Sequence, residues 1–265
     1  MRIALIQLAY GDAESLPDRV ERVAALVRAQ AGAELVVLPE LWSAGGFSYR
    51  EWDERSQDIA GPVVTALAAA ARDAGVWLHG GSIAEHPDSG EIGVEGKSLW
   101  NTSVVFAPDG EVAATYRKIH RFGFAGGEPK LMEAGTDLVL LDLPDGVRAG
   151  LSTCYDLRFP ELYRAQLDEG ATAFVIPAAW PMARVEAWRL LLQARAIEDQ
   201  CFVFACNTAG THAGTQMGGH SAVIAPTGEV LAEAGADEQV LTVDVDPATV
   251  AQTREAFPVL ADRRL

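Results

Sequence analysis

Short apolar segments alternate along this chain with segments of helical periodicity, and this order constrains the fold more than any other feature. Residues 35–38 are continuously apolar, as expected for a short strand that is buried on both faces of a sheet. Residues 17–31 repeat apolar side chains at helical spacing, and Gly32 closes that helix. The alternation recurs, with predicted strands at 1–8, 76–80, 148–153, 172–176 and 201–206 and predicted helices at 62–74, 160–168 and 187–199.

Two further stretches have the pattern of hairpins. Residues 99–116 contain two apolar segments around a Pro-Asp-Gly turn, and residues 221–232 contain two around a Pro-Thr-Gly turn. Hairpins inserted into an alternation of strands and helices favour an α/β fold with a mixed sheet or a pair of sheets. No linker between the elements is long or polar enough to mark a boundary, so we predict a single domain over residues 1–265.

The balance of charges argues against some classes of partner. The 265 residues carry a formal net charge of -16, which repels the phosphate backbone of nucleic acids. No apolar stretch has the length of a membrane span, and the first eight residues fit a strand better than a signal peptide. We therefore expect neither a nucleic-acid partner nor a membrane partner.

The cysteines indicate a reducing compartment. There are three, an odd number, in a chain that is large enough to fold without disulfides. They lack the paired short spacings of a zinc site. We expect a cytoplasmic protein without a structural metal.

Cys154 lies where a predicted strand gives way to a predicted helix. The strand 148–153 ends just before it, and Pro160 stands in the first turn of the helix. Such an elbow holds a side chain beside the backbone N–H groups of a helix start, which suits a nucleophile and a developing oxyanion. A small buried hydrophobe is an equally good interpretation of the elbow alone. Cys201 and Cys206 lie within a continuous apolar strand, which indicates core positions.

A nucleophilic cysteine needs a base, and the sequence favours a carboxylate over a histidine. None of the five histidines is singled out by its surroundings. Glu40 follows the buried strand 35–38 and lies between Pro39 and Trp42, at the rim where ligands bind in such sheets. Apolar neighbours raise the proton affinity of a glutamate, which suits a general base near neutral pH. A solvated loop glutamate is the alternative.

A third polar group follows the predicted strand 111–116. Lys118 lies there among aromatic and basic residues. A fixed ammonium in this place would stabilise an oxyanion and favour a thiolate. Taken singly, the stretch is more typical of a solvated basic turn.

Together and in this order, the three stretches resemble the nitrilase superfamily of carbon–nitrogen hydrolases, which carries a Glu–Lys–Cys triad. The stretches that match are 38–40, 116–120 and 154–161. Further matches cover nearly the whole chain, at 3–7, 100–103, 188–199, 218–221 and 257–264.

The resemblance implies a four-layer α-β-β-α sandwich that usually forms homodimers or larger homo-oligomers and uses neither a metal nor an organic cofactor. It assigns the base to Glu40, the nucleophile to Cys154 and stabilisation of the oxyanion to Lys118. The backbone N–H of Tyr155 is the second oxyanion donor in this scheme.

A second glutamate assists in this family, and the resemblance places it between the lysine and the cysteine. The candidates are Glu128 and Glu133. We choose Glu128, because the family's residue usually lies several positions before the Ala-Gly pair that Ala134-Gly135 matches. Its implied role is to orient Lys118 and the substrate amide.

The nucleophile motif also bears on the substrate. Residues 154–164 most resemble the branch of small aliphatic amidases and omega-amidases, so we expect hydrolysis of a small amide to a carboxylate and ammonia through a thioester on Cys154. True nitrilases commonly carry Cys-Trp-Glu where this chain has Cys-Tyr-Asp. Hydrolysis of N-carbamoyl amines is less well excluded. A non-catalytic binding protein and acyl transfer to another acceptor are the remaining alternatives.

Two aromatic residues are candidates for the substrate pocket. Trp180 follows the predicted strand 172–176 and is expected to face the acyl part of the substrate, with Phe124 as a second lining residue. Ordinary packing is the alternative for both. A substrate carboxylate would need a cation, for which the sequence offers Arg121, Arg158 and Arg184 without selecting one.

Overall fold

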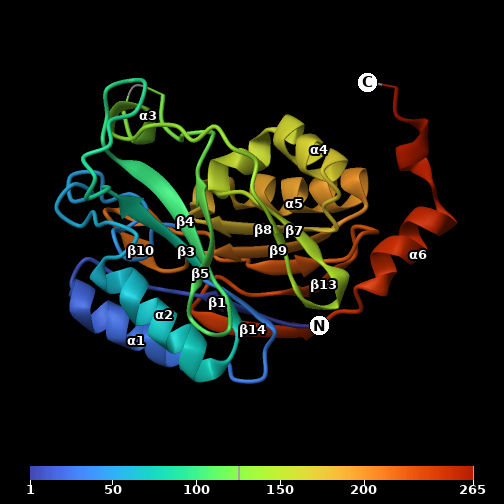
Figure 1. Ribbon diagram of the computed structural model, residues 1–265, viewed down its shortest axis with the longest axis horizontal. Helices are drawn as coiled ribbons and strands as arrows, with labels where there is room; N and C mark the ends of the chain where they lie inside the picture. Colours follow the sequence, from blue (N-terminus) through green and yellow to red (C-terminus); the bar gives the residue numbers. More distant parts are fainter. Residues whose placement is uncertain (125, 265) are drawn as a thin grey trace.

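Two six-stranded sheets pack face to face between two pairs of helices in the computed structural model, which describes residues 1–124 and 126–264. One outer face is covered by α1 (Leu16–Arg28) and α2 (Pro62–Ala74). The other is covered by α4 (Pro160–Asp168) and α5 (Val185–Asp199), as Figure 1 shows. The predicted four-layer α-β-β-α sandwich is confirmed.

The first sheet has three parallel strands at its centre. Its order is β14-β1-β2-β3-β4-β5. The strands β1, β2 and β3 run parallel, whereas β4, β5 and β14 are antiparallel to their neighbours. Their bounds are β1 Arg2–Gln7, β2 Leu35–Val37, β3 Trp77–Glu85, β4 Trp100–Phe106, β5 Val112–Arg117 and β14 Gln239–Asp244.

The second sheet repeats this plan. Its order is β13-β12-β9-β8-β7-β6, with β7, β8 and β9 parallel at the centre and the other three strands antiparallel to their neighbours. In both halves, each crossover between parallel strands is a helix. The bounds are β6 Leu140–Asp142, β7 Arg148–Leu151, β8 Ala173–Ala178, β9 Phe202–Asn207, β12 Ala222–Ile224 and β13 Val230–Glu233.

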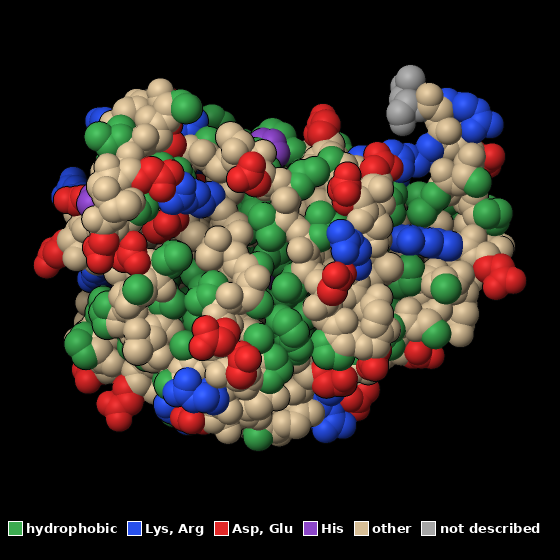
Figure 2. Space-filling model, viewed as in Figure 1, with side chains coloured by type: hydrophobic (Ala, Val, Ile, Leu, Met, Phe, Trp, Pro, Cys, Tyr) green, Lys and Arg blue, Asp and Glu red, His purple; other side chains and the backbone are tan. Residues whose placement is uncertain are grey.

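The remaining elements lie outside the four layers. Figures 1 and 2 show that the C-terminal segment stands out from the body. No helix among the described residues is long and apolar enough to cross a membrane. The elements are α3 Glu128–Leu131, β10 Thr211–His212, β11 Thr215–Gln216, α6 Ala248–Ala256 and the 3₁₀ helices η1 Pro144–Gly146, η2 Cys154–Arg158, η3 Met182–Arg184 and η4 Val259–Asp262.

Alternation along the strands fills three separate layers of core. In β1, Ala4 and Ile6 pack toward α1 and α2, while Ile3 and Leu5 pack between the sheets. The second sheet divides its side chains in the same way between the inter-sheet layer and the layer under α4 and α5. Because the central strands are buried on both faces, they are continuously apolar, and this is why they were predictable.

The predicted bounds hold best for elements with strong end signals. Both α2 and α4 begin at a proline and end as predicted. The strand predicted at 76–80 begins at Trp77 and continues to Glu85. The edge strand β14 was not predicted. Its side chains are half-buried or exposed, and they form no continuous apolar run.

A buried histidine in β3 links folding to pH. His79 follows Leu78, which faces the helices, so its ring faces the inter-sheet layer. Neither ring nitrogen has a hydrogen-bond partner among the described residues. Burial lowers the pKa of His79 to about 4. The unfolded chain, with an ordinary histidine pKa of about 6.5, therefore takes up a proton that the folded chain excludes between these two pH values.

Lowering the pH from 7 to 5 should therefore reduce the free energy of unfolding by about 2 kcal/mol through His79 alone. Urea unfolding at the two pH values measures this change. The control is His79→Met, which removes the titrating group and should lose about 2 kcal/mol less over the same step. Equal pH dependence of the two proteins would contradict the prediction.

Candidate active site

Three of the predicted residues follow strands whose carboxyl ends meet at one rim of the two sheets. Glu40 follows β2, Lys118 follows β5 and Cys154 follows β7. The direction of β5 is that of β2 and β3, because both β3 and β5 pair antiparallel with β4. The face-to-face packing of the sheets then brings the three side chains, which are distant in sequence, into contact with one cavity.

The loop that carries Glu40 is held tightly against β3. The Trp42 ring donates from Nε1 to the Gly80 carbonyl at 2.9 Å, and the Leu41 N–H donates to the Ser82 hydroxyl at 3.0 Å. Gly81 has a φ of 69°, and a Cβ there would lie 2.0 Å from the Pro39 carbonyl oxygen. Only glycine allows β3 to approach this loop so closely, and the approach fixes the position of Glu40.

Lys118 lies between two buried carboxylates. Its Nζ donates to Oε1 of Glu40 at 2.7 Å and to Oε2 of Glu128 at 2.8 Å. Asn101, on β4, donates through Nδ2 to both carboxylates, at 2.8 and 2.7 Å. The second oxygen of Glu40 accepts the Ala179 N–H at 2.9 Å. All four side chains are buried, and a buried charge is tolerated when it is paired and hydrogen-bonded in this way.

The charges of this cluster are set by its burial and by mutual attraction. Burial acts to lower the pKa of Lys118, but the carboxylates of Glu128 and Glu40 outweigh it and raise that pKa well above its usual value. Burial raises the pKa of Glu128, against the attraction of Lys118. The cluster thus keeps a permanent ammonium within reach of the cavity.

Cys154 lies on the elbow that its sequence position predicts, and its backbone there is strained. It has a φ of 49°, in the left-handed region that few residues other than glycine adopt, and it begins η2. Burial raises the pKa of its thiol well above the usual value, the charge of Glu40 adds to this rise, and Lys118 opposes it. The thiol is therefore protonated at neutral pH, and its attack on a carbonyl needs a base that takes the proton.

Asp156 connects the segment of Cys154 to the segment of Lys118. Its buried carboxylate accepts the Thr153 N–H at 2.9 Å on one side. On the other side it accepts the Tyr116 hydroxyl at 2.7 Å and the His120 N–H at 2.8 Å. Tyr116 and His120 lie two residues before and two residues after Lys118. Asp156 therefore ties the segment that carries the ammonium to the segment that carries the sulfur.

Replacing Asp156 by alanine should leave these three donors without their acceptor, and two of them, the Tyr116 hydroxyl and the Thr153 N–H, are buried. Each buried donor costs about 1–3 kcal/mol, so we expect a loss of at least about 2 kcal/mol in the free energy of unfolding, together with a large loss of activity. Urea unfolding and an amide-hydrolysis assay measure the two effects. The matched control is Asp142→Ala, at an exposed aspartate of β6. Unchanged stability of Asp156→Ala would contradict this role.

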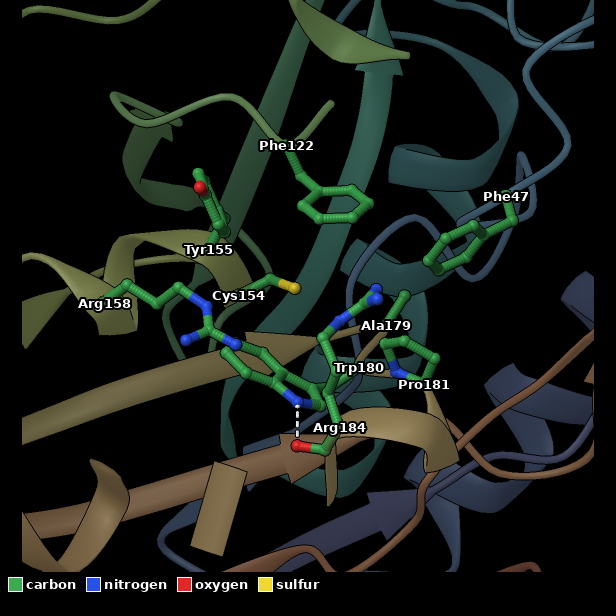
Figure 3. Close-up of a pocket in the computed structure, with 9 residues that line it drawn as sticks. All are labelled: Phe47, Phe122, Cys154, Tyr155, Arg158, Ala179, Trp180, Pro181 and Arg184. Atoms are coloured by element: carbon green, nitrogen blue, oxygen red, sulfur yellow. Dashed lines mark hydrogen bonds between the residues drawn. The ribbon is translucent and has the colours of Figure 1, made fainter. Parts of the chain in front are cut away.

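A pocket opens at the Cys154 sulfur. Figure 3 shows the sulfur pointing into it, with aromatic rings around it. Its cavity volume is about 20 Å³, far below the range of about 300–1,000 Å³ that is typical of drug-sized ligands, so it suits a small substrate. Side chains that line it include Phe47, Phe122, Tyr155, Arg158, Trp180 and Arg184.

Of the predicted lining residues, Tyr155 and Trp180 contact this pocket, but Phe124 does not. The Phe124 side chain is 92% exposed. Phe122, two residues earlier, lines the pocket instead, and its ring packs against those of Tyr155 and Phe47. The segment after Lys118 is irregular, so no periodicity indicates which of its phenylalanines faces inward.

The two candidates for the second glutamate are clearly separated. Glu128 joins Lys118, whereas Glu133 accepts backbone N–H groups of residues 95 and 97, away from the cavity at Cys154.

Two residues of the site, Asn101 and Phe47, were not predicted. Asn101 begins a run of three polar residues in the predicted strand 99–106, and such a run is the signal that could have singled it out, whereas Phe47 lies in a loop without a pattern. Among the described residues, no group of three His, Cys, Asp or Glu side chains is arranged to hold a metal ion.

Comparison with known sequences gives matches over almost the full chain. A family model described as carbon-nitrogen hydrolase matches residues 2–255. A protein of Paenarthrobacter nicotinovorans named 2-oxoglutaramate amidase is 44% identical, over 99% of this chain and 89% of its own length. A Homo sapiens protein named omega-amidase is 34% identical, over 99% of this chain and 95% of its own length.

Comparison with solved structures agrees with the sequence matches. The crystal structure of a CN-hydrolase superfamily protein from Xanthomonas campestris, described as having an arsenic adduct in its active site, aligns with a TM-score of 0.89. The alignment covers 100% of this chain and 97% of that chain, at 32% sequence identity. This chain therefore shares its whole architecture with that protein.

Proposed function

Because the chain belongs to the carbon–nitrogen hydrolase family and is an amidase, we propose that it releases ammonia from small omega-amides through a thioester on Cys154. The substrate class is that of its relatives named 2-oxoglutaramate amidase and omega-amidase. The observation that carries the mechanism is the buried contact of Lys118 with Glu40 and Glu128, beside a thiol whose pKa is raised.

The first proposed step is attack of the sulfur on the amide carbon. Glu40 takes the Cys154 proton as the S–C bond forms, because a free thiolate is disfavoured by burial and by the charge of Glu40 itself. The carbonyl oxygen becomes an oxyanion. Lys118 and the backbone N–H of Tyr155 stabilise it, since that N–H lies in the first turn of η2 and has no partner within the helix.

The second proposed step breaks the C–N bond. Protonated Glu40 gives its proton to the departing nitrogen, ammonia leaves and the acyl group stays on Cys154 as a thioester. Glu40, again a carboxylate, then takes a proton from water, which attacks the thioester carbon. As the S–C bond breaks and the carboxylic acid leaves, Glu40 returns this proton to the Cys154 sulfur. Glu128 keeps Lys118 in place through the 2.8 Å hydrogen bond while Glu40 changes its charge.

Ammonia release from a panel of substrates tests this function. The panel contains 2-oxoglutaramate, succinamate, butyramide, an N-carbamoyl amine and a nitrile. We expect the omega-amides to react with the highest kcat/KM. A faster reaction of the carbamoyl compound or the nitrile would replace omega-amides as the substrate class, and no reaction with any of them would contradict catalysis. Adding hydroxylamine separates hydrolysis from acyl transfer, because transfer yields a hydroxamate.

We also propose a homodimer, formed through α5 and the C-terminal segment. On α5, Leu190 and Ile197 are 69% and 52% exposed and lie seven residues apart, on one helical face. Phe257, between α6 and η4, is 68% exposed. Exposed apolar side chains are typical of interaction surfaces where they lie together. Light scattering should give the mass of two chains, and the mass of one chain would contradict the proposal.

The compartment follows from the chemistry of the proposed nucleophile. Cys154 must remain a reduced thiol in order to form a thioester. We therefore propose that the protein works in a reducing compartment such as the cytoplasm.

A further inference from the structure

Two arginines line the pocket that opens at Cys154, and they come from different elements. Arg158 ends η2, and Arg184 ends η3. Figure 3 shows their guanidinium groups on either side of the Cys154 sulfur in this view, with Trp180 between them. The cavity therefore has an aromatic wall and two cationic groups close to the atom that attacks the substrate.

Neither guanidinium group has a carboxylate partner among the described residues, although the chain is acidic. Arg117, Arg121 and Arg189 each form ion pairs with glutamates. No ion pair or hydrogen bond joins the Arg158 or Arg184 guanidinium to a carboxylate in the part of the chain that the structure describes. The third candidate, Arg121, pairs with Glu95 and is not among the residues that line the pocket.

Aromatic rings hold the two guanidinium groups in place instead. The Cζ atom of Arg158 lies 4.8 Å from the centroid of the Trp180 ring, and that of Arg184 lies 5.1 Å from the Phe122 centroid. Stacking of this kind positions a guanidinium while its N–H donors, which lie in its plane, stay available. Planar paired donors match the two oxygens of a carboxylate.

We propose that Arg158 and Arg184 form a carboxylate subsite that binds the end of the acyl chain opposite the amide. This inference rests on the proposed omega-amide hydrolysis and deepens it by naming the residues that select an acyl chain with a carboxylate at its far end. The two cations also offset the repulsion that a protein of net charge -16 exerts on an anionic substrate.

Succinamate and butyramide test the subsite, because both are four-carbon amides and differ at the far end, which is a carboxylate in one and a methyl group in the other. In Arg184→Gln and Arg158→Gln, kcat/KM for succinamate should fall about 10- to 100-fold, the usual effect of losing a hydrogen bond to a charged group. The loss for butyramide, which has no carboxylate, should be much smaller, so the ratio of the two kcat/KM values should fall. Arg184→Lys keeps the charge without the paired donors and should give an intermediate loss for succinamate. Arg189→Gln, on the outer face of α5, is the control.

An equal loss for both substrates, or no loss for succinamate, would overturn the subsite and leave amide hydrolysis standing. If the unmodified protein hydrolyses neither amide, both the proposed function and the subsite fail. Thermal unfolding of each variant shows whether it folds, and the butyramide rate provides the same check within the active site.

Discussion

Cys154→Ala should abolish ammonia release from every substrate of the panel. The variant lacks the only atom that the proposed mechanism uses to form a covalent intermediate. Loss of the nucleophile in enzymes that use covalent catalysis lowers kcat by on the order of 10⁵-fold or more. Ammonia assays at high enzyme concentration set the upper limit of the remaining rate. Intact-mass measurement after mixing with substrate should show an acyl adduct on the unmodified protein and none on the variant.

Two other cysteines provide the matched control for this experiment. Cys201 and Cys206 are buried, and burial raises the pKa of Cys201 to about 12. Cys201 contacts carbonyl oxygens and Arg254 rather than the pocket. Cys201→Ala should therefore keep near-normal turnover. If Cys154→Ala retained more than about one hundredth of the normal rate, covalent catalysis by Cys154 would be excluded, since the expected loss is far larger.

The positions of the reacting groups were predictable because strand ends are visible in the sequence. A strand buried on both faces is continuously apolar, so the first polar residue beyond it marks the rim of the sheet. Glu40 follows such a run directly, and Cys154 lies between a run and a helix that begins at Pro160. The sequence alone left each residue with an ordinary alternative. The contacts of Lys118 with Glu40 and Glu128 cross from one segment to another, and no local pattern encodes them.

The residues of the pocket were harder to predict than the positions of the reacting groups. The walls of the pocket come from loops, where side-chain direction has no period. Trp180 was placed through the strand that precedes it, whereas Phe124 was chosen from an irregular segment in which Phe122 faces inward. The sequence offers Arg121, Arg158 and Arg184 as cations for a substrate carboxylate. The structure shows that Arg121 pairs with Glu95, whereas the other two line the pocket. Long-range pairing of charges is a property of the fold.

Glu40→Gln should lower kcat by about 10²- to 10⁴-fold, the usual contribution of a general base. The resting thiol is protonated, because burial and the charge of Glu40 raise its pKa. Without a base, the thiolate must form through solvent. Its fraction increases tenfold per pH unit below the thiol pKa, so the rate of the variant should rise with pH where that of the unmodified protein does not. The rate at pH 6 to 9 measures this difference.

The geometry also predicts a cost in stability for Glu40→Gln. One glutamate oxygen accepts Lys118 and Asn101, and the other accepts the Ala179 N–H. A glutamine must turn its NH₂ group toward a donor on one side or the other, so we expect a loss of about 1–3 kcal/mol in the free energy of unfolding. Glu186→Gln, at an exposed glutamate of α5, is the control for both measurements.

The outcome of Glu40→Gln separates two roles that the contacts of this residue combine. If Glu40 only positioned Lys118, its neutral replacement would lose turnover without acquiring a new pH dependence, because the thiol would still lose its proton to another group. If Glu40 is the base, the variant is slow at neutral pH and faster in alkali. Acyl adducts should then also accumulate, because the same carboxylate activates the water that hydrolyses the thioester. A correctly folded variant with full activity at pH 7 would remove Glu40 from the mechanism. Cys154 would then need a different base, and among the described residues that line the cavity Glu128 is the one other carboxylate.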